Sequence, residues 1–256
     1  MTPIDAIEID HVTKTYLTER DERQALGPIT LAVTPGEMVA IVGPSGCGKS
    51  TLLSLIAGLI PVTSGEIRLF GEPVKGPSPR IGYMLQRDGL LEWRTVEENI
   101  ALGLEIRGQT SRKNLDQARY LLREMGLDSA VHQYPSQLSG GMRQRVALVR
   151  TMAIQPDILL LDEPFSAVDY QNKLHLEQML ISIRRQHQIT TVLITHDLEE
   201  SLALADRIVV LSHRPGKIRR MISLPEELRR ADPLETRSHP LFRTYFNELW
   251  KELEHP

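Results

Sequence analysis

The stretch that decides the fold is Gly43-Pro44-Ser45-Gly46-Cys47-Gly48-Lys49-Ser50-Thr51. It matches G-x-x-x-x-G-K-[ST], the pattern of a loop that binds phosphate groups. Residues 38–42, just before it, are apolar and largely β-branched, which predicts a buried strand. Residues 52–57, just after it, favour a helix that begins at about Lys49 and ends at Gly58. A strand, a glycine loop and a helix are the context that a phosphate site needs.

The residue types of this loop explain how it would hold phosphate. Its glycines let the backbone turn so that several N–H groups point at one anion, and the following helix adds its positive dipole end. Lys49 would reach the β- and γ-phosphates of a nucleotide, and the Ser50 hydroxyl would bind Mg²⁺. The alternative is a glycine turn that leads into a core helix, and the flanking strand and helix favour the phosphate site.

Length and composition fit one large domain or two small ones. The chain has 256 residues, 41% hydrophobic and 25% charged, as in ordinary soluble globular proteins. A net charge of −3 provides no basic field for nucleic acid. Residues 1–5 lack the features of a signal peptide, and the apolar stretch 52–62 falls short of the roughly 20 residues that span a bilayer. Any membrane role is therefore expected to go through a partner chain.

The chain contains one cysteine, Cys47, within the phosphate loop. One cysteine excludes a disulfide framework and a cysteine metal site, which fits a reducing cytoplasm. The thiol lies near a helix start and near Lys49, so we expect a lowered pKa and ready reaction. A thiol reagent would then block nucleotide binding, and the nucleotide would protect the thiol.

Apolar runs and helical patterns alternate along the chain, which indicates an α/β fold with a mainly parallel sheet and edge additions. Strands are predicted at residues 7–12, 29–33, 66–70, 81–85, 158–161 and 190–194, with a hairpin of 207–211 and 221–224. Helices are predicted at 95–107, 115–125, 144–154, 172–187, 198–205 and 240–253, and loops at 19–23 and 73–79. The block 87–156 has no strand signal, which predicts a helical subdomain inserted into the sheet domain.

Two acidic residues follow the apolar run at 158–161. Asp162 stands where a phosphate-loop protein holds Mg²⁺, often through water. Glu163 comes next, so its side chain points elsewhere, which suits a carboxylate that polarises the attacking water. Two acids at a strand end are common on their own, and the phosphate loop favours the functional interpretation.

A second anion site is predicted at Leu138-Ser139-Gly140-Gly141-Met142-Arg143-Gln144. A hydroxyl and two glycines precede a helical run, and such a helix start binds anions. One nucleotide does not need two such sites on one subunit. The economical interpretation is that this site serves a nucleotide held by another subunit, and a plain glycine turn at a helix start is the alternative.

Residues 4–225 resemble the ATP-binding cassette family, the ATPase subunits of ABC transporters, because the motifs follow in that family's order. The resemblance implies that Glu163, His196 and Gln86 are catalytic. It implies that Ser50, Gln86 and Asp162 bind Mg²⁺, and that Gln86 also contacts a membrane subunit. The residues expected to bind ATP are Tyr16, Gly43, Pro44, Ser45, Gly46, Cys47, Gly48, Lys49, Ser50, Thr51, Ser139, Gly140, Gly141 and Asp169. A structural histidine and a core aromatic side chain are the alternatives for His196 and Tyr16.

The fold implied by the resemblance is α/β. It has a P-loop NTPase (RecA-like) core with a mixed sheet, an N-terminal antiparallel β-subdomain and an inserted α-helical subdomain. Residues 1–256 would form a single cassette. Within it, 1–86 and 157–225 would be the nucleotide-binding core, 87–156 the helical subdomain and 226–256 a C-terminal helical tail.

Residues 90–96, 142–145 and 211–216 are similar to the nitrate, sulfonate and taurine importers. The chain departs from that group at Glu92, where proline is common, and at Ser166 and Val168, where glycine and leucine are common. The implied function is ATP hydrolysis by a head-to-tail homodimer, which drives transport of a small, anionic solute. The implied partners are transmembrane permease subunits and, indirectly, an extracytoplasmic solute-binding protein. The cassette would lie in the cytoplasm, on the inner face of the cell membrane.

Two other classes of protein remain as alternatives. One is a non-transport cassette that acts on nucleic acid or ribosomes, and we expect no nucleic-acid partner because the chain brings no coiled coil, zinc cysteines or second cassette. The other is a P-loop GTPase or small-molecule kinase, which has no use for residues 138–144.

Overall fold

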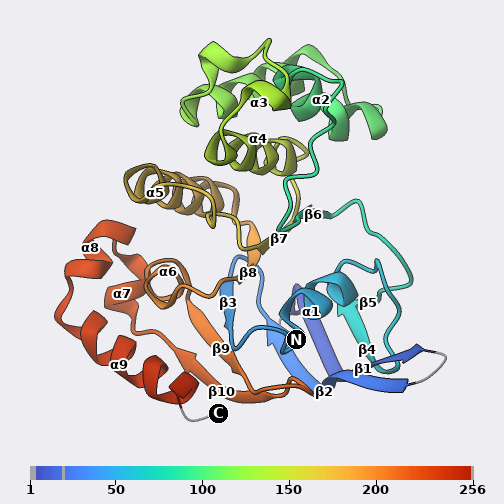
Figure 1. Cartoon of the computed structure of the whole chain (residues 1–256), viewed down its shortest axis with the longest axis vertical. Helices are drawn as coiled ribbons and strands as arrows, with labels where there is room; N and C mark the ends of the chain where they lie inside the picture. Colours follow the sequence, from blue (N-terminus) through green and yellow to red (C-terminus); the bar gives the residue numbers. More distant parts are fainter. Residues whose placement is uncertain (1–3, 19–20, 255–256) are drawn as a thin grey trace.

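The computed structural model describes residues 4–18 and 21–254, which form two sheets with helices packed around them (Figure 1). Residues 1–3 of the chain start, where no signal peptide is predicted, lie outside the described residues. So do residues 19–20 of the predicted charged loop.

The central sheet has six strands in the order β10-β9-β3-β8-β7-β6. They are β3 (Met38–Val42), β6 (Ile81–Met84), β7 (Ile158–Asp162), β8 (Thr190–Ile194), β9 (Arg207–Leu211) and β10 (Ile218–Ser223). Neighbours from β9 to β6 run parallel, and β10 pairs antiparallel with β9 as predicted, starting earlier than expected. Every residue of β3, β7 and β8 is buried, which explains their continuous apolar sequences.

Alternate residues of β3 face different cores. Val39 and Ile41 pack in a core with α1 (Lys49–Ile56), whereas Ala40 and Val42 join a core with α6 (Leu198–Leu204) and α9 (Pro240–Glu254). Because β3, β7 and β8 are parallel, their carboxyl ends meet at one edge of the sheet. The chain leaves that edge at residues 43, 163 and 195, which brings the phosphate loop, the acidic pair and the predicted histidine to one place.

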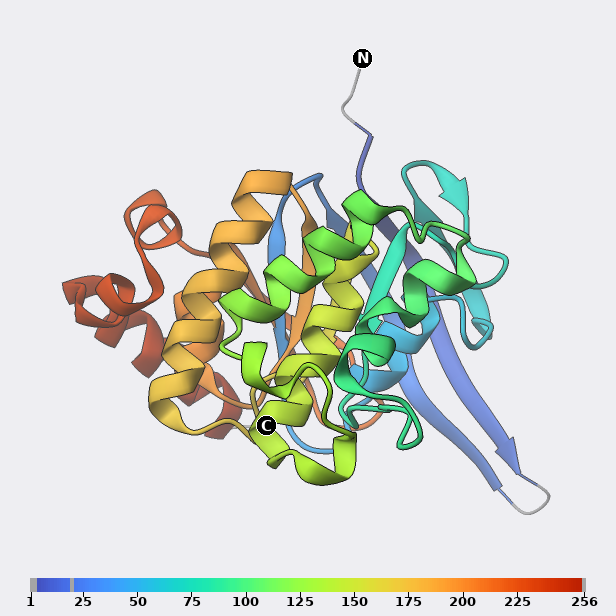
Figure 2. The ribbon, with the colours of Figure 1, turned by 90° about the horizontal axis from the view of Figure 1, so that it is seen from above.

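The second sheet is antiparallel and has the order β2-β1-β4-β5. Its strands are β1 (Ile7–Thr18), β2 (Asp21–Val33), β4 (Ser64–Leu69) and β5 (Glu72–Pro73). The predicted loop at 19–23 is wrong for 21–23, which lie in β2, and β1 runs past residue 12 to pair with them. Figure 2 shows this ribbon projecting from the body of the molecule. Glu22 and Arg23 are exposed on it, and their backbones pair with those of Leu17 and Tyr16. The antiparallel subdomain at the N-terminus is confirmed.

Three helices lie between β6 and β7: α2 (Val96–Ile106), α3 (Arg112–Glu124) and α4 (Gly140–Ala153). Two short 3₁₀ turns, Asp128–Ala130 and Pro135–Gln137, connect α3 to α4. All of residues 87–156 are described and none is in a strand, as the sequence predicts. The Thr95 hydroxyl accepts from Glu98 N–H, and the Glu98 carboxylate accepts from Thr95 N–H at 2.7 Å, so α2 starts with the predicted capping box.

The chain continues through α5 (Tyr170–His187) and, after β10, through α7 (Glu226–Arg230), α8 (Pro233–Ser238) and α9. Phe242 and Leu249 of the amphipathic helix α9 are buried against the core around α6. Within residues 4–18 and 21–254, no helix has both the length and the apolar character that crossing a bilayer requires.

Candidate active site

The phosphate loop joins β3 to α1 and depends on glycine at two positions. Gly48 precedes α1 with φ 101° and ψ 11°, a left-handed conformation that favours glycine. A Cβ atom at Gly48 would also lie 2.7 Å from Leu26 Cδ2 and 2.9 Å from the Ala25 carbonyl oxygen of β2. Gly46 has φ 74°, but no atom lies within 4 Å of a Cβ placed there. Backbone conformation and close approach therefore both require glycine at 48, and conformation alone favours it at 46.

The Lys49 side chain folds back over the loop. It is 9% exposed, and its Nζ donates hydrogen bonds to the carbonyl oxygens of Gly43, at 2.7 Å, and Pro44, at 3.0 Å. Both acceptors are uncharged carbonyl groups, so neither forms an ion pair with Lys49 that would compete with an anion in the loop. Gly43 and Pro44 thus hold the Lys49 side chain in place through their backbone carbonyl oxygens.

A cavity of about 300 Å³ opens at the phosphate loop. The predicted site residues that line it are Tyr16, Ser45, Gly46, Gly48, Lys49, Ser50, Thr51, Gln86 and Glu163. Tyr16 stands at the rim, 39% exposed, and Lys14 Nζ lies 5.2 Å from the centre of its ring. An exposed aromatic face, a basic loop and a carboxylate in one cavity fit a nucleotide with its base at one end and its phosphates at the other. We call this cavity of about 300 Å³ the nucleotide cavity.

Asp162 ends β7 beside the start of α1 and is 4% exposed. Burial raises the pKa of Asp162, a hydrogen bond with Ser50 opposes the rise, and the charge of Glu163 adds to it. A cation beside this buried carboxylate would stabilise its charged form. Among the described residues, no group of three or more His, Cys, Asp or Glu side chains could hold a metal by itself. The Asp162 carboxylate and the Ser50 hydroxyl, which are hydrogen-bonded to each other, are oxygen donors that fit Mg²⁺, an ion that takes one or two protein oxygens and fills its shell with phosphate and water.

Glu163 is the meeting point of the predicted catalytic residues. Gln86 Nε2 donates to Glu163 Oε2 at 3.2 Å, and His196 Nδ1 lies 3.3 Å from Glu163 Oε1. The backbone of Glu163 has φ 50°, an uncommon conformation for a residue with a side chain and one that clusters at functional sites. Gln86 and Glu163 face the nucleotide cavity, while His196 lines an adjoining cavity that also contains Glu163. This arrangement can hold a water molecule beside a phosphate and accept its proton.

The prediction of a reactive thiol at Cys47 is wrong. The side chain is 1% exposed and packs in the core beneath the loop, with Sγ 3.9 Å from Lys49 Nζ. Burial raises the pKa of Cys47, although the charge of Lys49 acts in the opposite direction. The loss of thiolate solvation outweighs the nearby ammonium, and Cys47 does not line the nucleotide cavity.

The second anion site is not part of this cavity. Ser139 caps α4 by accepting a hydrogen bond from Met142 N–H at 3.3 Å, and Gly140 starts the helix. A Cβ at Gly141 would lie 3.2 Å from Ala167 O, so the turn packs against the segment before α5, whose cap is Asp169. Ser139, Gly140, Gly141 and Asp169 are absent from the residues that line the nucleotide cavity.

Two arginines of α4 hold the segment that follows Gln86, and these contacts were not predictable from the sequence. Arg143 pairs with Asp88 through bonds of 2.8 and 3.1 Å and with Glu92 at 2.6 Å. Arg150 donates to the carbonyl oxygens of Gly89, at 2.7 Å, and Asp88, at 2.6 Å. Residues 88–92 are therefore clamped to the helix that begins beside Ser139, and we call these contacts the arginine clamp.

Arg214 lines the nucleotide cavity and was not predicted. It is exposed, and its Nε donates to Gln24 O at 3.3 Å. Backbone hydrogen bonds place its loop: Gly216 N–H donates to Ala25 O at 3.0 Å, and Gly27 N–H donates to Gly216 O at 2.9 Å. Backbone bonds of this kind leave no signal in the sequence.

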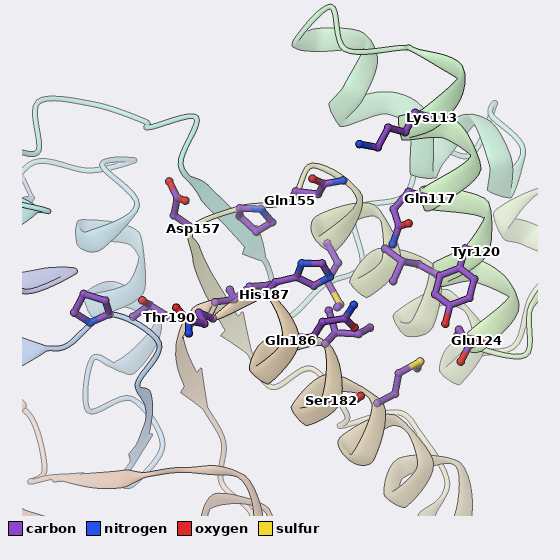
Figure 3. Close-up of a pocket in the computed structure, with 18 of the residues that line it drawn as sticks. Lys113, Gln117, Tyr120, Glu124, Gln155, Asp157, Ser182, Gln186, His187 and Thr190 are labelled. Carbon is purple, nitrogen blue, oxygen red and sulfur yellow. The ribbon is translucent and has the colours of Figure 1, made fainter.

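A larger cavity, of about 710 Å³, lies between α3 and α5 (Figure 3). It reaches Asp157 and Thr190, at the edge of the sheet opposite to the phosphate loop. Its side walls come from the helices, with Lys113, Gln117, Tyr120, Gln186 and His187 labelled in Figure 3. No predicted site residue lines it.

Comparisons with known proteins agree with this geometry. The family model described as "ABC transporter" matches residues 26–166. The uncharacterized ABC transporter ATP-binding protein YtlC of Bacillus subtilis is 44% identical over 96% of this chain and 95% of its own length. The nitrate import ATP-binding protein NrtD of Synechocystis sp. is 41% identical over 95% of this chain and 93% of its own. The aliphatic sulfonates import ATP-binding protein SsuB of Bacillus licheniformis is 42% identical over 90% of this chain and 87% of its own.

Solved structures are similar as well. The dimeric structure of MJ0796, a bacterial ABC transporter cassette, covers 86% of this chain and 99% of its own, with a TM-score of 0.79 and 32% identity. A second structure of MJ0796 is a dimeric post-hydrolysis state bound to ADP and phosphate, with a TM-score of 0.78. The motifs, the cavity that they build and these likenesses agree, and the chain belongs to the ABC transporter family as an ATP-binding cassette with ATPase activity.

Proposed function

We propose that this cassette hydrolyses ATP with Glu163 as the base, and that it does so as a head-to-tail homodimer in an importer. The observation that carries the proposal is the convergence of Gln86 and Glu163 on the cavity of the phosphate loop. Loop N–H groups and Lys49 bind the phosphates, and Tyr16 offers its face to the adenine. Ser50 and Asp162 would hold Mg²⁺, with Gln86 beside it. When bound, the ion neutralises charge that develops on the phosphates.

In the proposed reaction, the oxygen of a water molecule attacks the γ-phosphorus, and the bond to the β–γ bridging oxygen breaks. Glu163 takes the proton of the water, Gln86 holds the carboxylate on one side, and His196 faces it on the other. Glu163→Gln keeps the shape of the side chain and removes the base. We expect hydrolysis to slow by about 10²–10⁴-fold while ATP binding persists. Turnover near that of the wild type would contradict the assignment.

The place of the second anion site supports the proposed dimer. Ser139 and the glycines after it lie outside the cavity of their own subunit, and a neighbouring copy can bring them to the γ-phosphate. The dimeric form of MJ0796 supports this arrangement. Asp169, which caps α5 next to the segment that Gly141 contacts, would lie near the same junction.

The test uses Glu163→Gln to keep ATP bound and measures mass by sedimentation. With ATP and Mg²⁺ this variant should sediment as a dimer. Adding Ser139→Asp should keep it a monomer that still binds ATP, because aspartate preserves the helix cap but repels the γ-phosphate. The matched control adds Ser111→Asp, the same change at the cap of α3, and should still dimerise. A monomer at saturating ATP, or a dimer that Ser139→Asp leaves intact, would overturn the split site.

We further propose that the transported solute is a small anion of the nitrate, sulfonate or taurine kind. Relatives named for nitrate and aliphatic sulfonates import support this class. The cassette would dock through Gln86 and the helical block on permease subunits, at the cytoplasmic face of the membrane, and a solute-binding protein would act outside. The division into a core (1–86 and 157–225), a helical subdomain (87–156) and a tail (226–256) belongs to the same proposal.

Co-expression with the permease and solute-binding proteins of an importer of this class should yield a complex that carries the cassette. ATP turnover of this complex in vesicles should rise when a solute of this class is added with its binding protein. Binding to nucleic acid or ribosomes, with none to the permease, would favour the non-transport alternative.

A further inference from the structure

A partly buried group of charges follows His196 in the fold and joins α5 to the start of α6. Lys173 Nζ is 2.7 Å from Asp197 Oδ2 and 2.8 Å from Glu200 Oε2. The side chains of Lys173 and Glu200 are 12% and 4% exposed. Lys173, Asp197 and Glu200, which we call the lysine cluster, do not line the nucleotide cavity, and the proposed function gives them no role.

The lysine cluster sets the course of the turn that carries His196. Asp197 Oδ1 accepts from the N–H groups of Glu199, at 2.9 Å, and Glu200, at 3.2 Å, which caps α6. Asp197 N–H donates to Thr195 Oγ1 at 3.0 Å. Both chain neighbours of His196 are therefore tied down. The imidazole itself is exposed, so this backbone decides where it lies relative to Glu163.

The same cluster reaches the helix that starts at Asp169. Lys173 lies in the first turn of α5, just after the segment that Gln144 binds through Ser166 Oγ, at 2.9 Å, and Ala167 N–H, also at 2.9 Å. A cavity of about 250 Å³ joins these parts, and its lining includes Glu163, Ser166, Lys173, His196, Asp197 and Glu200. The lysine cluster thus connects the segment that contacts Gln144 of α4 to the turn that carries His196.

Stability alone does not explain these charges. Three carboxylates (Glu177, Asp197 and Glu200) face two cations (Lys173 and Arg237). Burial raises the pKa of Glu200 to about 7, and its Oε1 has no hydrogen-bond partner within the described part of the chain. Buried ion pairs lose solvation as well as gain attraction, and apolar side chains of similar volume often stabilise a fold equally well. An ion cluster differs in that it holds its members in one geometry.

We propose that Lys173 is a positioning residue for His196: by holding Asp197 and Glu200, it fixes the turn that presents the imidazole to Glu163. The inference rests on the proposed role of His196. The inference adds that the position of the imidazole depends on α5, and therefore on the segment before α5 that contacts Gln144 of α4.

The test compares Lys173→Met with Arg184→Met. Both remove a buried cation from α5, but Arg184 pairs with Asp206, at 2.8 Å, near the start of β9 and not with the turn of His196. Steady-state kcat and KM for ATP are measured where circular dichroism finds each variant folded. Lys173→Met should lower kcat at least about tenfold and leave KM within about twofold, because a small displacement of a reacting group is costly. Arg184→Met should keep kcat within about twofold of the wild type.

Lys173→Arg should keep kcat within about threefold of the wild type, because a guanidinium can still pair with the carboxylates of Asp197 and Glu200. Should Lys173→Met fail to fold, Asp197→Asn tests the same point, because asparagine keeps the helix cap and loses the charge that holds Lys173. Equal kcat values for Lys173→Met and Arg184→Met, or a normal kcat for Asp197→Asn, would overturn the inference. His196→Ala separates the two claims: normal turnover in that variant refutes the role of His196 itself, whereas a loss there with normal Lys173→Met refutes only the positioning.

Discussion

The phosphate loop allows backbone strain and steric clash to be separated by three matched substitutions. Gly48→Ala meets both costs, because φ is 101° and the new Cβ would lie 2.7 Å from Leu26 Cδ2 and 2.9 Å from Ala25 O. Gly46→Ala meets only the first, with φ 74° and open space around the Cβ. Gly76→Ala meets neither and serves as the control.

The expected losses of unfolding free energy follow from these contacts. A left-handed conformation costs a residue with a side chain about 1–2 kcal/mol, so Gly46→Ala should lose about that much. A clash with a carbonyl oxygen and a core leucine adds about 1–3 kcal/mol, so Gly48→Ala should lose roughly 2–5 kcal/mol in total. Gly76→Ala should change stability by less than about 1 kcal/mol.

ATP affinity should follow the same order, because a loop pushed away from β2 misdirects its N–H groups. We expect Gly48→Ala to raise the Kd at least about tenfold, which corresponds to about 1.4 kcal/mol. Urea unfolding reports the stability and equilibrium titration with ATP reports the Kd. Equal values for Gly46→Ala and Gly48→Ala would refute the claim that β2 shapes the loop.

Three further predictions concern side chains outside the loop backbone. Cys47 should react with N-ethylmaleimide at least about tenfold more slowly in the native protein than in urea, because burial raises its pKa; mass spectrometry measures both rates, and equal rates would restore the reactive thiol. The pKa of Glu200 is raised to about 7, so the folded state binds this proton more tightly than the unfolded state. The contribution of Glu200 to the free energy of unfolding is therefore lost as pH rises from about 4.5 to 7, at up to about 1.4 kcal/mol per pH unit. Glu200→Gln should flatten the dependence of the unfolding free energy on pH, and an unchanged slope would contradict the shift. Arg214→Ala should raise the Kd for ATP about three- to tenfold with kcat unchanged, through loss of a positive charge at the rim. Arg112→Ala, which removes an exposed arginine at the start of α3, should change neither.

The local parts of the fold were predictable because one stretch of sequence carries each signal. The strand, loop and helix around Gly48, and the capping box at Thr95, depend on neighbours within a few residues. The short helices α7 and α8 were not resolved within the predicted tail, because five or six residues are too few to show a helical period.

The candidate site residues were predicted from the family resemblance. The burial of a side chain, and contacts between residues far apart in the sequence, were not predictable in this way. The spacing of residues near Cys47 indicates proximity to Lys49, but it does not reveal that the thiol points into the core. The contact between Glu163 and His196 depends on β7 and β8 being neighbours, which the order of strands along the chain leaves open. Arg214 reaches the cavity through backbone bonds that any sequence could make.

The arginine clamp has a consequence for timing. The amide of Gln86 donates to the carboxylate of Glu163, and two positions later Asp88 is paired with Arg143, on the helix whose first turn would meet the other ATP in the proposed dimer. These contacts connect Glu163 to α4 through residues 86–88, so a displacement at one end would be passed to the other. In a head-to-tail dimer, hydrolysis at the two sites would therefore be coupled, because cleavage of one ATP would disturb the residues that act on the other.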